Sequence, residues 1–316
     1  MRCRGYSRPL QRAIIDFGAD LPFARVSEKL KEHYGITIPP GAAVRQTYRH
    51  ARTLSDADIL PKAQPKVAPI TLIAEVDGSM VPVVQIAPAD ADTSRDKRKR
   101  RILLWKEARL TLVRAPAAIE PTFAVTLGDV ATTGTNLKHL AIAAGLGRQT
   151  LVHGVGDGAP WIAEQMEVQF GTQGHYLIDF YHLCDYLAAA APVCAPDRPA
   201  QWLSVQKDRF KSGDLAAVMA DLDAHREASS ASGTTPVRDA HRYIAHRPGQ
   251  FDYPQAIAAN LPIGSGEVES AHRYVIQKRL KLPGAWWLPD NAQAMLNLRC
   301  LRANHRWSDY WARLAA

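Results

Sequence analysis

The hydrophobic period of the chain changes at Ile70, and this change limits the possible folds more than any other feature. Short apolar segments typical of strands follow one another from there, at 70–76, 81–86, 102–104, 110–113 and 122–127. Helix and strand patterns then alternate through 134–145, 150–155, 159–170, 175–180 and 181–190. Strands in succession, followed by strands alternating with helices, predict an α/β fold: a mixed sheet with helices on its faces.

Helical regions lie on both sides of this sheet pattern. Residues 1–65 predict helices and then a linker rich in Ala, Pro and Lys. A helix, a short break at 35–40 and a basic helix with Arg45 and Arg49 follow the order of a helix-turn-helix, although a plain helical bundle fits the same spacing. Residues 191–260 have no strand pattern and are interpreted as an all-helical insertion. The insertion would divide the core into 66–190 and a last part, 261–316, made of basic helices.

The composition narrows the range of partners and locations. The chain has 316 residues, a net charge of +8 and a pI of about 9.4, a balance that favours polyanions such as nucleic acid. No apolar run is long enough to span a bilayer, and the N-terminus lacks the apolar core of a signal peptide. We therefore expect a soluble, cytoplasmic protein. The four cysteines form no CxxC pair, so neither a zinc knuckle nor a disulfide framework is indicated.

Two aspartates each follow an apolar strand segment and precede a glycine. Asp77 stands in Val76-Asp77-Gly78, and Asp157 stands in Gly156-Asp157-Gly158. An acid held rigidly at a strand end suits a hard cation such as Mg²⁺. The alternatives are a surface aspartate at a turn for Asp77 and a helix N-cap for Asp157. If the two strands are neighbours in the sheet, their carboxylates converge.

A glycine-rich loop at 262–266 opens a helix with two acids, Glu267 and Glu269, in its first turn. The apolar arc of this helix comprises Val268, Ala271, Val275 and Ile276. At about 100° per residue, Glu269 falls inside that arc and Glu267 falls on the opposite side. A carboxylate facing the sheet needs a partner. A metal shared with the two aspartates is one candidate, and an ion pair with Arg273 is the other.

Four short motifs, in their order along the chain, resemble those of the RNase-H-fold DDE transposases. They are specifically similar to those of a bacterial insertion-sequence group related to the Mutator-like transposases. The motifs are Val76-Asp77-Gly78, 156–162, 179–182 and 264–270, and Arg279-Leu280-Lys281 and Trp286-Trp287 extend the match. The resemblance covers roughly residues 70 to 311. The N-terminal part is short for such proteins, as expected of a truncated copy.

The resemblance implies a metal triad of Asp77, Asp157 and Glu269 that binds two Mg²⁺ (or Mn²⁺) ions. Asp179 and His182 match a further family motif with an accessory role, and Glu267 is the alternative to Glu269. The implied function is metal-dependent phosphodiester cleavage and strand transfer at the ends of an insertion sequence.

The implied partner is double-stranded DNA, both the transposon ends and the target, bound by a homodimer or a higher oligomer and with no role for a membrane. The candidate DNA contacts are Arg45, Arg49, Arg98, Lys99, Arg100, Arg273, Lys278, Arg279 and Lys281. Two other functions fit the same residues. One is an RNase-H-like nuclease or resolvase that cleaves without joining, and the other is a catalytically dead, DNA-binding remnant of a transposase.

Overall fold

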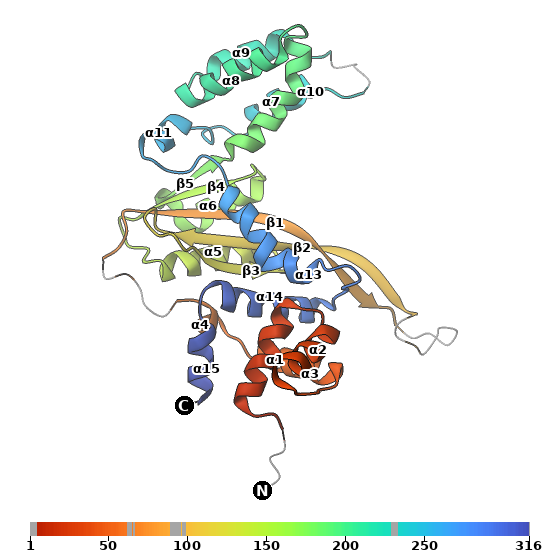
Figure 1. Cartoon of the computed structure of the whole chain (residues 1–316). Helices are drawn as coiled ribbons and strands as arrows, with labels where there is room; N and C mark the ends of the chain where they lie inside the picture. The colour runs from red at the N-terminus through yellow and green to blue at the C-terminus, as the bar shows by residue number, and fades with distance from the viewer. Residues whose placement is uncertain are drawn as a thin grey trace.

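The computed structural model describes residues 5–61, 65, 67–88, 96, 99–228 and 233–315. At its centre is a sheet of five strands: β1 (Thr71–Ile86), β2 (Arg101–Arg114), β3 (Thr122–Thr126), β4 (Leu151–Gly156) and β5 (Gly174–Ile178). Their order across the sheet is β3-β2-β1-β4-β5 (Figure 1). β2 is antiparallel to both of its neighbours, whereas β1, β4 and β5 are parallel. This mixed sheet confirms the expected α/β class and is compatible with an RNase-H-like fold.

Helices cover both faces of the sheet. One face packs on α5 (Val130–Ala143) and α6 (Pro160–Phe170), and the other packs on α12 (Gly266–Ala271) and α14 (Pro289–Ala303). Successive side chains of a strand point to opposite faces, so β1 contributes Val76 to the first core and Val81 to the second. Between α12 and α14, a π-helical segment (His272–Gln277) is followed by the short helix α13 (Lys278–Leu280).

Further helices lie beyond the sheet on either side (Figure 1). Between β5 and α12, the described residues form α7 (Phe180–Cys194), α8 (Pro199–Ser212), α9 (Leu215–Ala224), α10 (Pro236–Ala245) and α11 (Tyr253–Ala258). Before β1, they form α1 (Arg8–Asp20), α2 (Phe23–Tyr34), α3 (Pro40–Ala51) and α4 (Asp56–Ile59), and the chain closes with α15 (Trp307–Ala315). The helix-turn-helix, the insertion and the domain boundaries stay predictions. Within the described part of the chain, no helix combines the length and the apolar character needed to cross a membrane.

The sequence predicted two strands separated by a break at Gly78-Ser79, and this prediction was wrong. β1 runs unbroken through both residues and pairs with β2 along this stretch, where Gly78 lies opposite Arg109. A glycine is required at this position because the side chain of Glu107 on β2 occupies the space that a Cβ at Gly78 would need. β2 is likewise continuous, joining the segments expected at 102–104 and 110–113. Asp77 therefore lies within a strand and not at its end.

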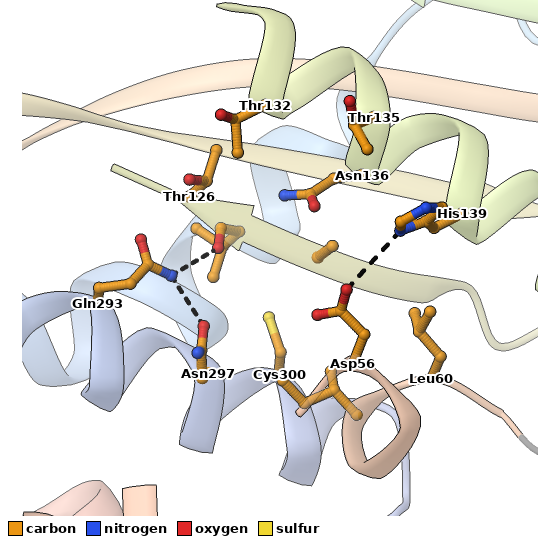
Figure 2. Close-up of a pocket in the computed structure, with 13 residues that line it drawn as sticks. Asp56, Leu60, Thr126, Thr132, Thr135, Asn136, His139, Gln293, Asn297 and Cys300 are labelled. Atoms are coloured by element: carbon orange, nitrogen blue, oxygen red, sulfur yellow. Dashed lines mark hydrogen bonds and ion pairs between the residues drawn. The ribbon is translucent and has the colours of Figure 1, made fainter. Parts of the chain in front are cut away.

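Two side-chain amides from α14 and its C-terminal end pair with the outer edge of β3. The Oε1 of Gln293 accepts from the Leu127 amide at 2.8 Å, and its Nε2 donates to the Val125 carbonyl at 3.0 Å. Asn304 pairs with both backbone groups of Phe123, accepting at 2.8 Å and donating at 2.9 Å. Figure 2 shows Gln293 reaching from the helix toward the strand, at one end of a pocket of about 350 Å³. These amides satisfy the backbone groups that an edge strand otherwise leaves open.

Candidate active site

Three aspartates lie in a row across the parallel part of the sheet. Asp157 directly follows β4 and Asp179 directly follows β5, while Asp77 lies within β1. The strand registers, continued past their last paired residues, place Asp77 beside Asp157 and Asp157 beside Asp179. Each of the three occupies an alternating strand position that faces the side of the sheet covered by α12. The sheet thus places the two aspartates predicted as metal ligands side by side, with Asp179, predicted as an accessory residue, next to Asp157.

Asp77 is in direct contact with a histidine that the sequence interpretation did not assign. The Nε2 of His272 lies 3.1 Å from the Oδ2 of Asp77, whose side chain is 30% exposed. Its Oδ1 accepts from the Gly78 amide at 2.7 Å. The contact with His272 has the distance of an ion pair without hydrogen-bond geometry. His272 is three residues after Glu269, and this helical spacing is the signal that could have revealed it.

Asp157 is half-buried and is the first residue of the turn between β4 and α6. Its Oδ1 accepts from the Ala159 amide at 2.8 Å, and its backbone carbonyl accepts from the Tyr243 hydroxyl at 2.8 Å. The N-cap residue of α6 is Ala159, so the structure does not support the alternative of Asp157 as that cap. Of the two hydrogen bonds, the first holds the carboxylate and the second holds the backbone of Asp157.

The two glutamates of α12 have different surroundings. Glu267 forms an ion pair with Arg114 of β2, with the guanidinium Nε 2.7 Å from its Oε2. Glu269 is exposed, and its pKa is raised first by partial burial and then by the negative charges of Asp179 and Asp77. Glu269 therefore lies within electrostatic range of Asp77 and Asp179, whereas Glu267 is paired with Arg114 of β2.

The helical wheel was wrong about the exposure of Glu269. The four apolar residues of the arc are indeed buried, but Glu269 is more exposed than Glu267. The helix widens to π geometry from His272 onward, so a constant angle of about 100° per residue does not carry through to Ile276. The ion pair with Arg273, which competed with a metal in the sequence interpretation, is absent among the described residues.

Asp179 and His182 lie at the start of α7, and Asp179 is buried. One oxygen of Asp179 accepts from the Tyr181 and His182 amides at 2.6 and 3.1 Å. The other oxygen accepts from the amide and the hydroxyl of Ser265, both at 2.6 Å. Asp179 therefore fastens α7 to the loop that opens α12. The exposed His182 offsets part of the rise in the pKa of Glu269 that burial and the two aspartates cause, so the two side chains interact electrostatically.

Glu75 is an acid that the sequence interpretation missed. It is 1% exposed, and its Oε2 accepts from the Val268 amide in the first turn of α12 at 2.8 Å. Burial raises the pKa of Glu75 to about 8, with smaller contributions that include the negative charge of Glu267. An acid inside an apolar strand segment was the available signal, since such a group needs a partner. This hydrogen bond ties the first turn of α12 to β1.

Replacing Glu75 by alanine should destabilise the protein by roughly 1–3 kcal/mol, because the buried Val268 amide loses its acceptor. Glu75→Gln should cost less, because an amide oxygen accepts the same bond and the side chain keeps its volume. Urea unfolding followed by circular dichroism measures both. Glu164→Gln, a change at an exposed carboxylate on α6, is the control. Equal losses for the alanine and glutamine variants would mean that the bond to α12 contributes nothing.

Most of the basic residues proposed as DNA contacts are exposed. The exposed ones are Arg45, Arg49, Lys99, Arg273, Lys278 and Lys281. Arg98 lies outside the described residues, and the partly buried Arg100 donates to the Ala87 carbonyl at 2.8 Å. Arg279 does not support the prediction. It is 2% exposed, and its guanidinium lies 4.8 Å from the ring centres of both Phe23 and Trp287, so it serves packing and not a surface contact.

The donor set of this site consists mainly of carboxylate oxygens, which hard divalent cations prefer. The pKa of Glu269 is raised first by partial burial and then by the negative charges of Asp179 and Asp77, and a bound cation would relieve that repulsion. No three His, Cys, Asp or Glu side chains in the described ranges are grouped closely enough to hold a metal ion as they stand. The residues fit a metal site by their chemistry and by their shared face, and the ligand set is not preassembled.

No family model matches the chain, and no curated protein matches it. Among solved structures, it is similar to the Drosophila P element transposase strand transfer complex. The match has 11% sequence identity and a TM-score of 0.38, and it covers 97% of this chain and 81% of that chain. A likeness this distant assigns no function.

Proposed function

We propose that the protein is a DNA transposase of the DDE type that cleaves and joins phosphodiesters at the ends of an insertion sequence. The observation that carries the proposal is the surroundings of Glu269. Its carboxylate interacts with Asp77 and Asp179, whereas the neighbouring Glu267 is paired with Arg114. Helix dipole complementarity accounts for an acid in this turn, but it does not account for an acid within electrostatic range of two aspartates on the sheet.

Asp77, Asp157 and Glu269 would hold two Mg²⁺ (or Mn²⁺) ions. When bound, such ions supply Lewis acidity for attack by water or a 3′-hydroxyl and for departure of the leaving oxygen. The chain itself supplies position and charge balance. His272 contacts the carboxylate of Asp77. Glu75 holds the first turn of α12, and Asp179 holds the loop before it.

The proposed partner is double-stranded DNA, from the element's ends and from the target, bound by a homodimer or a larger oligomer. Three exposed basic residues follow Glu269 along the chain: Arg273 in the π-helical segment, Lys278 in α13, and Lys281 directly after α13. Cationic side chains beside a cluster of acids orient a phosphate backbone by contacts that carry no sequence information. This arrangement favours a nucleic acid substrate over a neutral one such as a sugar.

Metal dependence tests the proposal directly. Purified protein should cleave duplexes carrying the terminal sequences of its element with Mg²⁺ or Mn²⁺, stop with EDTA, and recover when Mg²⁺ is restored. Ca²⁺ should support DNA binding better than turnover, because its looser coordination misplaces the reacting oxygens. Gel analysis of the products separates hydrolysis from joining. Cleavage that continues in EDTA would rule out the two-metal mechanism, and cleavage without any joined product would identify a nuclease instead.

A further inference from the structure

A second pocket, of about 430 Å³, lies outside the candidate active site between the two ends of the chain. Its walls come from α1, from the C-terminal end of α3 and from α15. Three arginines line it, one from each of these elements: Arg8, Arg49 and Arg313. All three side chains are exposed, and their convergence from three separate helices concentrates positive charge at the pocket.

The protein balances this positive charge only in part. Arg313 pairs with Asp58 at 2.7 Å, while Arg8 and Arg49 form no ion pair with another described residue. None of the described residues that line the pocket is acidic. The positive potential reaches the neighbouring His50, whose pKa is lowered first by burial and then by the charge of Arg49. The pocket therefore holds an excess of positive charge.

Of the two buried nitrogen-bearing rings at the pocket, that of His50 has hydrogen-bond partners and that of Trp311 has none among the described residues. The His50 ring is satisfied on both sides, with the Tyr310 hydroxyl at 2.8 Å and the Gln11 Oε1 at 2.9 Å. Trp311 packs against this ring and is 6% exposed, yet its indole Nε1 has no hydrogen-bond partner in the described part of the chain. Two exposed guanidinium groups without ion pairs, in a pocket with no acidic residue among its described lining residues, favour an anionic ligand, and the indole of Trp311 lies beside them as a reporter of its binding.

We propose that this pocket binds a phosphate of the DNA backbone. The inference rests on the proposed function in one respect, namely that DNA is the partner. Arg45 is exposed one helical turn before Arg49 on α3, so a duplex seated at the pocket meets a second cation along the same helix. Arginine is the side chain best suited to phosphate, because its fork of donors matches the phosphate oxygens. The C-terminal helix would then join the N-terminal helices in one DNA-binding surface.

Selective ¹⁵N labelling of tryptophan tests the pocket in the intact protein. Trp311→Phe assigns the indole signal of Trp311, and inorganic phosphate should shift that signal with saturation in the wild-type protein. The double variant Arg8→Ala, Arg49→Ala should weaken this binding by roughly tenfold or more, since charge-assisted bonds are the strong ones. Arg25→Ala is the matched control, because Arg25 is an exposed arginine on α2 that pairs with Glu28 at 3.1 Å. An indole signal that phosphate leaves unmoved would overturn the proposal.

A second arm separates a backbone phosphate from a free one. A short duplex should shift the same indole signal and compete with inorganic phosphate. The slope of log affinity for the duplex against log salt should decrease by about 0.9 in the double variant, the contribution of one phosphate. A response to inorganic phosphate without a response to DNA would identify a small-anion site and contradict the assignment to DNA.

Neither arm depends on cleavage, so the pocket and the proposed chemistry can fail separately. The Asp77→Asn variant should give the same indole shifts as the wild-type protein, because Asp77 does not line the pocket. DNA binding at the pocket in a protein that never cleaves DNA would refute the catalytic proposal alone. Cleavage by a protein whose Trp311 signal ignores both phosphate and DNA would refute the pocket alone.

Discussion

Replacing Glu269 by glutamine should abolish DNA cleavage while the protein still folds and still binds DNA. The amide keeps the shape of the side chain but lacks the charge that a metal ligand needs. We expect a loss of roughly 10³-fold or more, as for other residues that act in one catalytic unit. Asp77→Asn and Asp157→Asn should give losses of the same order, and combining the substitutions should add little. Single-turnover cleavage of labelled duplex, with a separate gel-shift assay for binding, measures both properties.

Glu267→Gln is the control for this experiment, because it changes the same chemical group two residues away on the same helix. Glu267 is part of an ion pair with Arg114 at 2.7 Å, and both side chains are partly exposed. The substitution should cost at most about 1 kcal/mol of stability and should leave most of the activity. An active Glu269→Gln protein beside an inactive Glu267→Gln protein would show that the wrong carboxylate has been chosen.

The second large effect is expected at Asp179. Its two oxygens accept four hydrogen bonds, and an asparagine there would turn an NH₂ group toward one pair of donors. Each buried donor left without an acceptor costs roughly 1–3 kcal/mol. Asp179→Asn should therefore lower the urea midpoint of unfolding and, at conditions where the protein remains folded, reduce cleavage by releasing the loop at Ser265.

Asp129→Asn provides the comparison for Asp179. Asp129 is the exposed N-cap of α5 and accepts from the Thr132 amide at 2.8 Å, so its role in capping a helix is similar. Asparagine caps a helix about as well as aspartate does, and the stability of this variant should be unchanged. If Asp179→Asn were equally harmless, Asp179 would be an ordinary cap and not a fastening between α7 and α12.

The α/β class followed from the sequence because strand and helix periods are properties of short segments. The long hairpin of β1 and β2 did not follow, because Gly78 suggested a turn until the packing of Glu107 explained it. The difference between Glu267 and Glu269 could not be derived reliably either. It depends on Arg114, 153 positions away in the chain from Glu267, and on a π-helical segment that no periodicity reveals. Glu75 went unnoticed because its strand was interpreted by its apolar neighbours.

The pairing of Gln293 and Asn304 with the edge of β3 has a consequence for how the chain is made. All five strands are synthesised before α14, so a growing chain presents the outer backbone groups of β3 with no partner until Gln293 emerges. An open edge of this kind recruits strands from other molecules. Translation arrest before residue 289 would thus leave a sheet whose open β3 edge can pair with strands of other copies of the chain. Once α14 is in place, subunits can meet through helices but not by extending the sheet at β3.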